Sequence, residues 1–558
     1  MIFKKIIAII LTMALLTSGY FLVIQLNNYR QSMELTRANL SVQATPDLLT
    51  NVLLSVGRAL AVDYLWIGLQ KMQEEGRYFD AMQRAEWICQ LQPHFPSVWV
   101  FQSWNMSYNI SVAMTTGEDR WRWVRNGYEL LRDRAIPLNP KSIVLYYQLS
   151  WIFFHKIGAL SDDYHWYYKI QLARAMEKII GWPDAKYDLM AKAPSDWETL
   201  LKNKEIALFV RKLREMKIDP RKDFLNILKK REEMGEKVLA LIDAPANRSS
   251  RDALEGFLRA DALRTKWKMD PKIIADLRKP DMYGPLDFRL PQSHAIYWAY
   301  LGLKRSGRNV SFDALNAIMK KGDTFNALNC KRVIYGSLQD IFKRGRFIIT
   351  SDGIPLISPD IRFIPILHRV YLSLGKNYAE AEGKKWDGTA GETFRSGHVN
   401  FLRKAIAMYF QYGRMDMAKK YWKILNKLYP NKEYNIGMQA YIYKYIREDL
   451  QSMGLADANA TVMMFLMQAY TRYALGDDYE AAALKKWAKM VYDAYMKDKL
   501  LRQQTGRTAL ASWDKMNRQA IEFVLKSISP KLAQRLCERL NIKVRPKTSN
   551  SERRQLKK

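Results

Sequence analysis

The fold is decided by the stretch Glu75-Gly76-Arg77-Tyr78-Phe79-Asp80-Ala81, which Pro93 follows. In the segment before it, apolar residues recur at spacings of three and four, as is typical of one face of a helix: Leu53, Val56, Leu60, Tyr64 and Ile67. The segment after it, 84–91, continues as a second arm. Pro93 ends this arm, because proline lacks an amide hydrogen and disfavours helix just before itself. The stretch therefore predicts the turn and second arm of a helical hairpin.

The same frame recurs at Gly413-Arg414-Met415-Asp416-Met417-Ala418, and Pro93 and Pro430 each stand seventeen residues after the glycine of their frame. A partial third instance is Trp298-Ala299-Tyr300-Leu301-Gly302, and a looser fourth runs from Ala469 to Ala482. Small residues allow two helices to approach closely, and proline ends the pair. We expect roles in helix packing for ten residues of these frames: Gly76, Tyr78, Ala81, Pro93, Trp298, Leu301, Gly302, Gly413, Ala418 and Pro430.

The spacing of Gly76, Tyr78, Ala81 and Pro93 resembles the tetratricopeptide repeat (TPR), a unit of about 34 residues with such residues at corresponding positions. The sequence departs from the family pattern at Gly68, where a leucine is typical, and the matched units cover only part of the chain. The resemblance implies an all-α fold, a TPR-like solenoid of helical hairpins with a concave binding surface.

An N-terminal apolar run, 6–24, contains no charged residue. Nineteen helical residues span close to the ~30 Å of a bilayer core, which predicts a transmembrane anchor. A cleavable signal peptide is the alternative, with an apolar core of roughly 7–15 residues. Lys4 and Lys5 precede the run and favour a cytoplasmic N-terminus. We expect a single-pass protein of the bacterial inner (cytoplasmic) membrane whose body is periplasmic or extracytoplasmic.

Changes in composition divide the chain into eight segments. Asp352-Gly353 between two short apolar runs predicts a β-hairpin, in which Pro355 restricts the second strand to an edge. The predicted segments are an anchor (1–29), a linker (30–47), N-terminal TPR-like repeats (48–182), a charged helical insertion (183–282), a helical repeat unit (283–345), the β-hairpin (346–360), C-terminal TPR-like repeats (361–540) and a basic disordered tail (541–558).

The charge balance is strongly basic, with 89 Lys and Arg against 56 Asp and Glu and a formal net charge of +33. Such a charge favours anionic partners, although a generally basic surface is the simpler interpretation. An extracytoplasmic body argues against nucleic acid as a partner. The three cysteines are widely spaced and form no metal-binding motif. No phosphate-binding loop, HExxH, GxSxG or GxGxxG motif is present, so we expect no cofactor, no metal and no enzymatic activity.

The best polar constellation is the loop 283–294, which precedes a predicted helix. Asp287, Arg289 and His294 would lie at the N-terminus of this helix, where the helix dipole favours anions. In the alternative interpretation, Asp287 and Arg289 pair to hold the loop and Ser293 caps the helix. Arg395-Ser396-Gly397-His398 suggests a similar passage from loop to helix.

Two further clusters carry candidate residues. Arg122 and Arg125 alternate with aromatic residues, a pattern that can stack on bases or sugars. In the alternative, Arg125 pairs with Glu129 on a solvated face, while the apolar residues at helical spacing form a buried stripe: Trp121, Val124, Tyr128 and Leu131. His155 and His165, with two aspartates between them, imitate metal ligands but lie among aromatic core positions.

Taken together, these patterns predict a membrane-anchored scaffold. It would mediate protein–protein interaction or the assembly of an envelope complex through a concave helical groove. The alternative is a cell-envelope polymer-processing enzyme with its site near residues 283–294.

Overall fold

The structure is a computed structural model that describes Gln25 and residues 48–307, 325–349, 355–381, 390–452, 454–501 and 509–542. These residues are mostly helical, which confirms the all-α prediction for this part of the chain. The chain divides into two compact units. The first holds 48–149, 302–307 and 325–330 of the described residues, and the second holds the others from 150 onwards.

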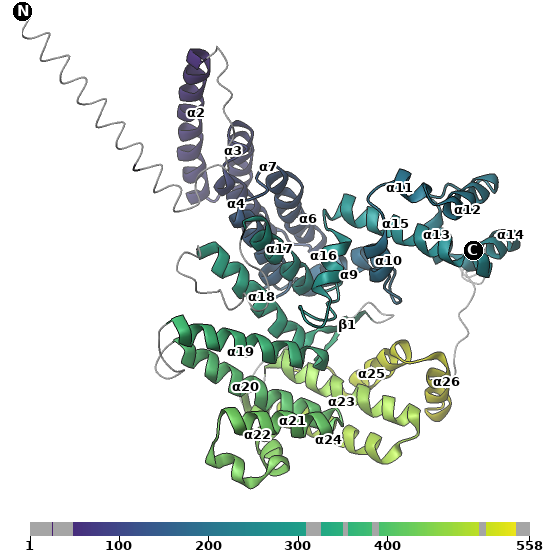
Figure 1. The fold of residues 1–558 in the computed structure, drawn as a ribbon. Helices are drawn as coiled ribbons and strands as arrows, with labels where there is room; N and C mark the ends of the chain where they lie inside the picture. The colour runs from purple at the N-terminus through teal and green to yellow at the C-terminus, as the bar shows by residue number, and fades with distance from the viewer. Residues whose placement is uncertain are drawn as a thin grey trace, which may run out of the picture. The chain divides into compact units, whose positions relative to one another are not determined.

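The first unit begins with the helical hairpin of α2 (Leu48–Glu74) and α3 (Tyr78–Leu91), shown in Figure 1. Its core contains Trp99, Val124 and Leu131, all at most 1% exposed. Shorter helices follow, two of them π-helical: α4 (Pro96–Trp104), η1 (Asn105–Ile110), α5 (Ser111–Ala113), α6 (Gly117–Glu129), η2 (Leu130–Ala135), α7 (Ile136–Leu138) and α8 (Ile143–Trp151).

The second unit starts with a π-helical turn, η3 (Ile152–Ile157), and the long helix α9 (His165–Ile180). The charged segment 183–282 then folds into short helices: α10 (Tyr187–Lys192), α11 (Trp197–Leu201), α12 (Lys204–Glu215), α13 (Phe224–Lys229), η4 (Arg231–Glu233), α14 (Glu236–Asp243), η5 (Pro245–Asn247), α15 (Arg248–Lys266) and α16 (Pro271–Leu277).

After these helices come α17 (Pro291–Arg305) and α18 (Phe325–Arg344), each of which has residues in both units. The remaining elements are β1 (Arg346–Ile349), β2 (Pro355–Ser358), η7 (Ile361–Phe363), α19 (Ile364–Ala381), α20 (Ala390–Gln411), α21 (Met415–Leu428), η8 (Lys432–Ile436), α22 (Met438–Ser452), α23 (Leu455–Leu475), α24 (Asp478–Leu501), α25 (Trp513–Ser527) and α26 (Pro530–Arg539).

Helix α23 is the centre of the C-terminal core. Its central turns, 462–467, are buried on all sides, as expected of a helix surrounded by others, and Met463, Phe465 and Leu466 are each at most 1% exposed. Helices α24, α25 and α26 pack around it. Two strands lie where the β-hairpin was predicted: β1 and β2 pair antiparallel, with Ile349 opposite Pro355 at the first residue of β2. The predicted turn at Asp352-Gly353 lies outside the described residues.

Three hairpins share one turn geometry. Gly76, Gly413 and Gly476 have φ of 71°, 66° and 90°, the left-handed region that favours glycine. In each hairpin the residue after the glycine donates its amide to the carbonyl five positions earlier, and its own carbonyl accepts from an alanine four positions later. The first set of bonds runs from the amide of Arg77 to the carbonyl of Met72 (2.9 Å), from Arg414 to Tyr409 (2.8 Å) and from Asp477 to Arg472 (3.0 Å). In the second set, the amides of Ala81, Ala418 and Ala481 donate to the carbonyls of Arg77, Arg414 and Asp477 at 2.9–3.0 Å.

The two hairpins with the full sequence frame match further. The second helices, α3 and α21, are both 14 residues long and start two positions after the glycine. Ala81 and Ala418 are fully buried, so a small side chain lies where the two arms meet. Each helix ends two residues before the proline of its frame, Pro93 or Pro430.

In the partial third frame, Trp298 and Leu301 are buried, at 1% and 4% exposed. Gly302 lies against Tyr146 of α8, where an added Cβ would be only 2.4 Å from the tyrosine Cβ. The backbone of α17 can therefore approach α8 this closely because position 302 has no side chain.

Three predicted segments lie at the ends of the chain. The predicted anchor (6–24), the linker (30–47) and most of the basic tail lie outside the described residues. Among the helices that are described, none combines the length and the apolar character needed to cross a membrane.

One local expectation is wrong. Arg395, Gly397 and His398 do not lie at a passage from loop to helix, because α20 already begins at Ala390. They are inside the helix, and His398 is fully buried.

Candidate functional site

The loop before α17 brings two of its three predicted residues together. Arg289 and Asp287 form an ion pair of 2.7 Å, and the Arg289 amide also donates to the Asp287 carboxylate. Arg289 is only 3% exposed, and its guanidinium additionally pairs with Glu177 of α9 at 3.2 Å and donates to the Phe347 carbonyl of β1 at 2.8 Å. The pair thus connects the loop to α9 and β1. This agrees with the alternative interpretation, in which Asp287 and Arg289 pair to hold the loop.

His294 faces the core instead of the loop surface. Its Nε2 lies 2.9 Å from the Phe288 carbonyl, its ring stacks on Phe153, and the residue is fully buried. The Ser293 hydroxyl donates to the Asp287 carbonyl at 2.7 Å and so stabilises the loop. Asp287 and His294 therefore have separate partners, and no contact joins them as an acid–base pair.

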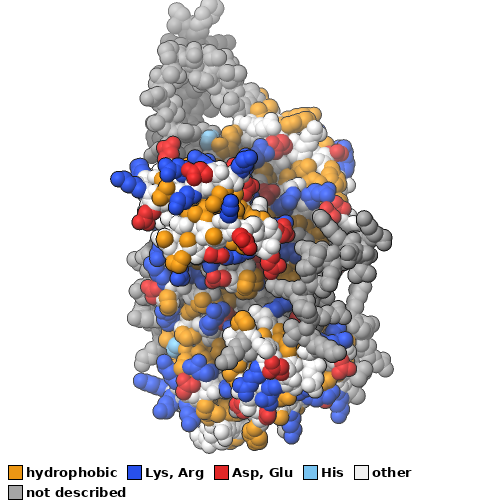
Figure 2. Space-filling model, turned by 90° about the vertical axis from the view of Figure 1, so that its right-hand side faces the viewer, with side chains coloured by type: hydrophobic (Ala, Val, Ile, Leu, Met, Phe, Trp, Pro, Cys, Tyr) orange, Lys and Arg blue, Asp and Glu red, His pale blue; other side chains and the backbone are white. Residues whose placement is uncertain are grey.

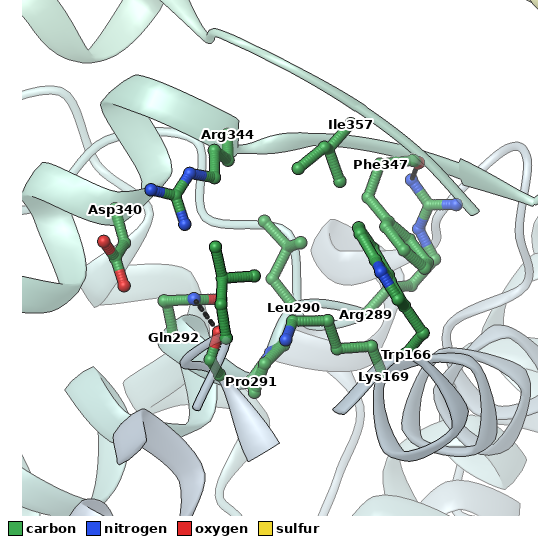
Figure 3. A pocket seen from close by; sticks show the side chains of 12 residues that line it. Trp166, Lys169, Arg289, Leu290, Pro291, Gln292, Asp340, Arg344, Phe347 and Ile357 are labelled. Atoms are coloured by element: carbon green, nitrogen blue, oxygen red, sulfur yellow. Dashed lines mark hydrogen bonds between the residues drawn. The ribbon is translucent and has the colours of Figure 1, made fainter. Parts of the chain in front are cut away.

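Arg289 also lines a pocket of the second unit, shown in Figure 3. The pocket offers about 20 Å³ to the centres of water-sized molecules. Its walls come from the residues that follow η3, from α9, from the loop before α17 and the start of that helix, from the end of α18 and from both β-strands. The polar lining residues are Lys169, Arg289, Gln292, Asp340 and Arg344, and the apolar ones include Leu160, Trp166, Leu290, Phe347 and Ile357.

Lys169 is the lysine that lines this pocket, and the residue is only 8% exposed. Its Nζ donates to the Ala159 carbonyl at 2.9 Å and lies 3.1 Å from Nδ1 of His165. Burial lowers the pKa of Lys169 to about 7 and that of His165 to about 3. The ammonium therefore has neutral hydrogen-bond partners in an environment that disfavours its charge.

Asp340 and Arg344 project into the pocket from successive turns of α18 (Figure 3). Burial raises the pKa of the Asp340 carboxyl, against the opposing charge of Arg344 and a hydrogen bond from Gln292. A terminal nitrogen of Arg344 pairs with Asp457 at 3.4 Å. The Arg344 Nε is buried and, within the described part of the chain, has no hydrogen-bond acceptor.

Of the polar residues that line this pocket, the sequence singled out Arg289, as a candidate at a helix N-terminus, but not Lys169, Gln292, Asp340 or Arg344. These residues come from three helices far apart in the sequence, and no local motif connects them. A signal existed only for Lys169, whose charge stands among the aromatic residues of 164–168.

The His155–His165 region holds an ion pair where a metal site was considered. Lys156 and Asp162 pair at 2.6 Å, and both side chains are at least nine-tenths buried. Where the structure describes the chain, no group of three His, Cys, Asp or Glu side chains is placed to hold a metal ion.

Arg122 and Arg125 lie on an exposed face of α6. Arg122 pairs with Asp119 at 3.3 Å, and Arg125 with Glu129 at 3.9 Å. On another face, Val124 and Tyr128 are at most 2% exposed. The geometry is that of a buried apolar stripe with a solvated charged face.

Three exposed apolar side chains of the first unit lie on one face of α2. We call Leu60, Tyr64 and Ile67 the α2 face; they are 65%, 70% and 71% exposed. Val62 and Leu69, on the opposite side of the helix, are at most 3% exposed and form the contact with α3. The sequence pattern thus identified the helix and its stripe, but Leu60, Tyr64 and Ile67 of the stripe are exposed to solvent.

Gly68 explains one departure from the repeat pattern. The guanidinium of Arg84 from α3 lies directly against Gly68, so that an added Cβ would be 1.7 Å from an Arg84 nitrogen. The same guanidinium stands 5.8 Å from the ring centre of Tyr64. A leucine at position 68 would displace this cation from the edge of the α2 face.

No family model matches the chain, and no curated protein matches it.

Proposed function

We propose that the chain is a membrane-anchored, TPR-like scaffold, and that its α2 face binds a helix of a partner protein in an envelope complex. The observation that carries the proposal is the exposure of Leu60, Tyr64 and Ile67, at 65–71% each. Large apolar side chains gathered on one exposed face are typical of interaction sites. The hairpin turns at Gly76, Gly413 and Gly476 support the TPR-like part of the proposal, because they repeat one geometry.

The spacing of the α2 face favours a helix as its ligand. Leu60, Tyr64 and Ile67 follow one another by four and three residues, so they form one ridge about 10 Å long. Such a ridge packs into the groove between side chains of a second helix. Burial of three large apolar side chains stabilises a complex by roughly 1.5–3 kcal/mol each before the costs of association.

The positive charge of the chain near the α2 face indicates which side chains the partner helix carries. Arg84 lies beside Tyr64 at the edge of the α2 face, and the chain carries a net charge of +33. Figure 2 shows Lys and Arg side chains spread over the face that it displays, with Asp and Glu among them. We therefore expect the partner helix to be amphipathic, with an acidic residue next to its apolar ridge.

Copurification tests the proposal. The tagged full-length chain would be isolated from detergent-solubilised membranes, and bound proteins would be quantified for the wild type, Leu60→Asp and Ile67→Asp. The matched controls are Leu475→Asp and Tyr479→Asp, at residues of the second unit that are 50% and 89% exposed. Circular dichroism would show that all variants are folded.

We expect one protein to be lost about tenfold or more from both α2 variants and to be retained by both controls, since a buried charge in an apolar contact costs more than ~1.4 kcal/mol. The opposite result, an unchanged set of bound proteins in Ile67→Asp, would exclude the α2 face as the binding surface.

A further inference from the structure

Helix α21 of the second unit, which is labelled in Figure 1, carries a row of exposed lysines. Lys419, Lys420, Lys423 and Lys427 are all exposed to solvent. Because their spacings are three, four and eight residues, helical geometry places them on one side of α21, over a length of about 12 Å. We call these four residues the α21 lysine face.

The other side of α21 is packed into the unit. Ala418, Tyr421 and Leu425 are at most 3% exposed, and α21 packs against α20. The ring of Trp422 contacts the rings of Tyr434 and Tyr441, with centroids 5.5 Å and 5.2 Å apart. The packing of the fold therefore uses these side chains, and the lysines are left on the outer surface.

The charge of the α21 lysine face is not neutralised by ion pairs within the described part of the chain. The acidic residues that flank it in the sequence pair with arginines instead: Asp416 with Arg414 at 3.4 Å, and Glu433 with Arg403 at 3.6 Å. Residues 395–432 contain nine Lys and Arg but only one acidic residue. Such a local excess of positive charge attracts anions.

We propose that the α21 lysine face binds the anionic headgroups of a lipid membrane. This inference rests on the proposed function, because the N-terminal anchor holds the body near a bilayer. A lysine close to an anionic membrane surface strengthens binding by about fivefold. The four lysines act together, since they lie on one side of one helix.

The surroundings of the lysines favour lipid over protein or nucleic acid. By helical spacing, the other residue of α21 on this side is Asp416, so no apolar side chain lies between the lysines. The centres of protein–protein interfaces are poor in lysine and rich in aromatic residues. Single-stranded nucleic acid needs exposed rings on which bases stack, but the Trp422 ring packs within the fold.

Amine modification in lipid nanodiscs tests the proposal. The full-length chain would be inserted into discs of phosphatidylcholine, with and without phosphatidylglycerol, and treated with a water-soluble amine-reactive ester. Mass spectrometry would give the modification rate of each lysine. We expect the α21 lysine face to react about fivefold more slowly when phosphatidylglycerol is present, and high salt to remove this protection.

Matched variants assign the protection to this face. The double variant Lys419→Gln, Lys423→Gln is expected to restore the modification of Lys420 and Lys427 to the rate in phosphatidylcholine. The control removes the same charge at Lys222 and Lys230, exposed lysines of the same unit that pair with acidic residues. Lys222→Gln, Lys230→Gln is expected to leave the protection unchanged, and circular dichroism would show that both double variants are folded.

Equal modification of the α21 lysine face in the two kinds of disc would overturn the proposal. Protection by an added oligonucleotide or acidic peptide, but not by phosphatidylglycerol, would overturn it too and would indicate another class of partner. The anchor is tested separately, because it is expected to hold the chain in neutral discs at high salt. A chain that left these discs would refute the anchor, whereas protection by phosphatidylglycerol would still support the α21 lysine face.

Discussion

At the scale of single residues, folding changes the protonation of ionisable groups that it buries. His368 Nδ1 lies 2.9 Å from His398 Nε2, and the Tyr429 hydroxyl lies 2.7 Å from His398 Nδ1. Each of these two contacts needs a single proton, so both hydrogen bonds can form while the two rings are neutral. Burial lowers the pKa of His368 to about 4 and that of His398 to about 3, so both rings are neutral in the folded protein near pH 6.

This pair gives a pH prediction. An unfolded histidine has a pKa near ~6.5, so it binds a proton at pH values at which the folded, buried histidine stays neutral. The free energy of unfolding therefore falls as the pH drops from about 6.5 to about 4. The slope is up to ~1.4 kcal/mol per pH unit for each histidine. His398→Phe, measured by urea unfolding at several pH values, is expected to show a smaller slope than the wild type. Parallel stability curves for the two proteins would contradict the assignment.

Prediction from sequence succeeded at this scale for local pairs. Asp287 with Arg289 and Arg125 with Glu129 are separated by two and four residues, so their contacts follow from loop and helix geometry. It failed for Lys169 and Arg344, which face one pocket although 175 positions separate them. Such a meeting depends on the tertiary packing of α9 and α18, and no spacing in the sequence encodes it.

At the scale of elements, the helical hairpins depend on close approach at small residues. The sequence marked Gly76, Gly413 and Gly476 because a tight turn with positive φ requires glycine. Helical periodicity also placed α2 correctly. It could not tell that Leu60, Tyr64 and Ile67 are exposed, because an apolar stripe is the same pattern whether the chain itself or a partner covers it.

Gly302→Ala tests one close approach. The new Cβ would lie 2.4 Å from the Cβ and 2.9 Å from the Cγ of Tyr146, so the helices must shift. Overpacking of this kind costs about 1–3 kcal/mol. Thermal or urea unfolding of the full chain is expected to show this loss.

Gly235→Ala is the control for this variant. Gly235 has φ −69° and no atom within 4 Å of a built Cβ. A change within about 0.5 kcal/mol is expected there. Equal effects of the two substitutions would mean that Gly302 is not a packing contact.

At the scale of the whole molecule, we propose an N-terminal anchor joined to a body that binds protein. The composition predicted the helical class of the described residues, since good helix formers dominate and glycine and proline are few. The division into two units was not predicted, because residues 302–307 and 325–330 belong with the N-terminal part of the chain. Only the folded chain shows that distant segments share a core.

Membrane attachment and orientation are tested together. A reporter that is active only outside the cytoplasm, fused after Lys558, is expected to be active if Lys4 and Lys5 hold the N-terminus inside. Replacing residues 1–29 by a cleavable secretion signal is expected to release the body from the membrane fraction. A C-terminal reporter that is active only in the cytoplasm would reverse the orientation, and a body that still sediments with membranes would show a second attachment.

Site-specific photocrosslinking in intact cells shows whether the α2 face holds a partner helix. A photoreactive amino acid would be placed in turn at Leu60, Tyr64 and Ile67, and at Leu475 and Tyr479 as exposed controls. We expect the three α2 positions to crosslink to one and the same protein and the two controls not to do so. Crosslinks to that protein from the control positions as well, or crosslinks from the α2 positions to lipid alone or to nothing, would contradict it.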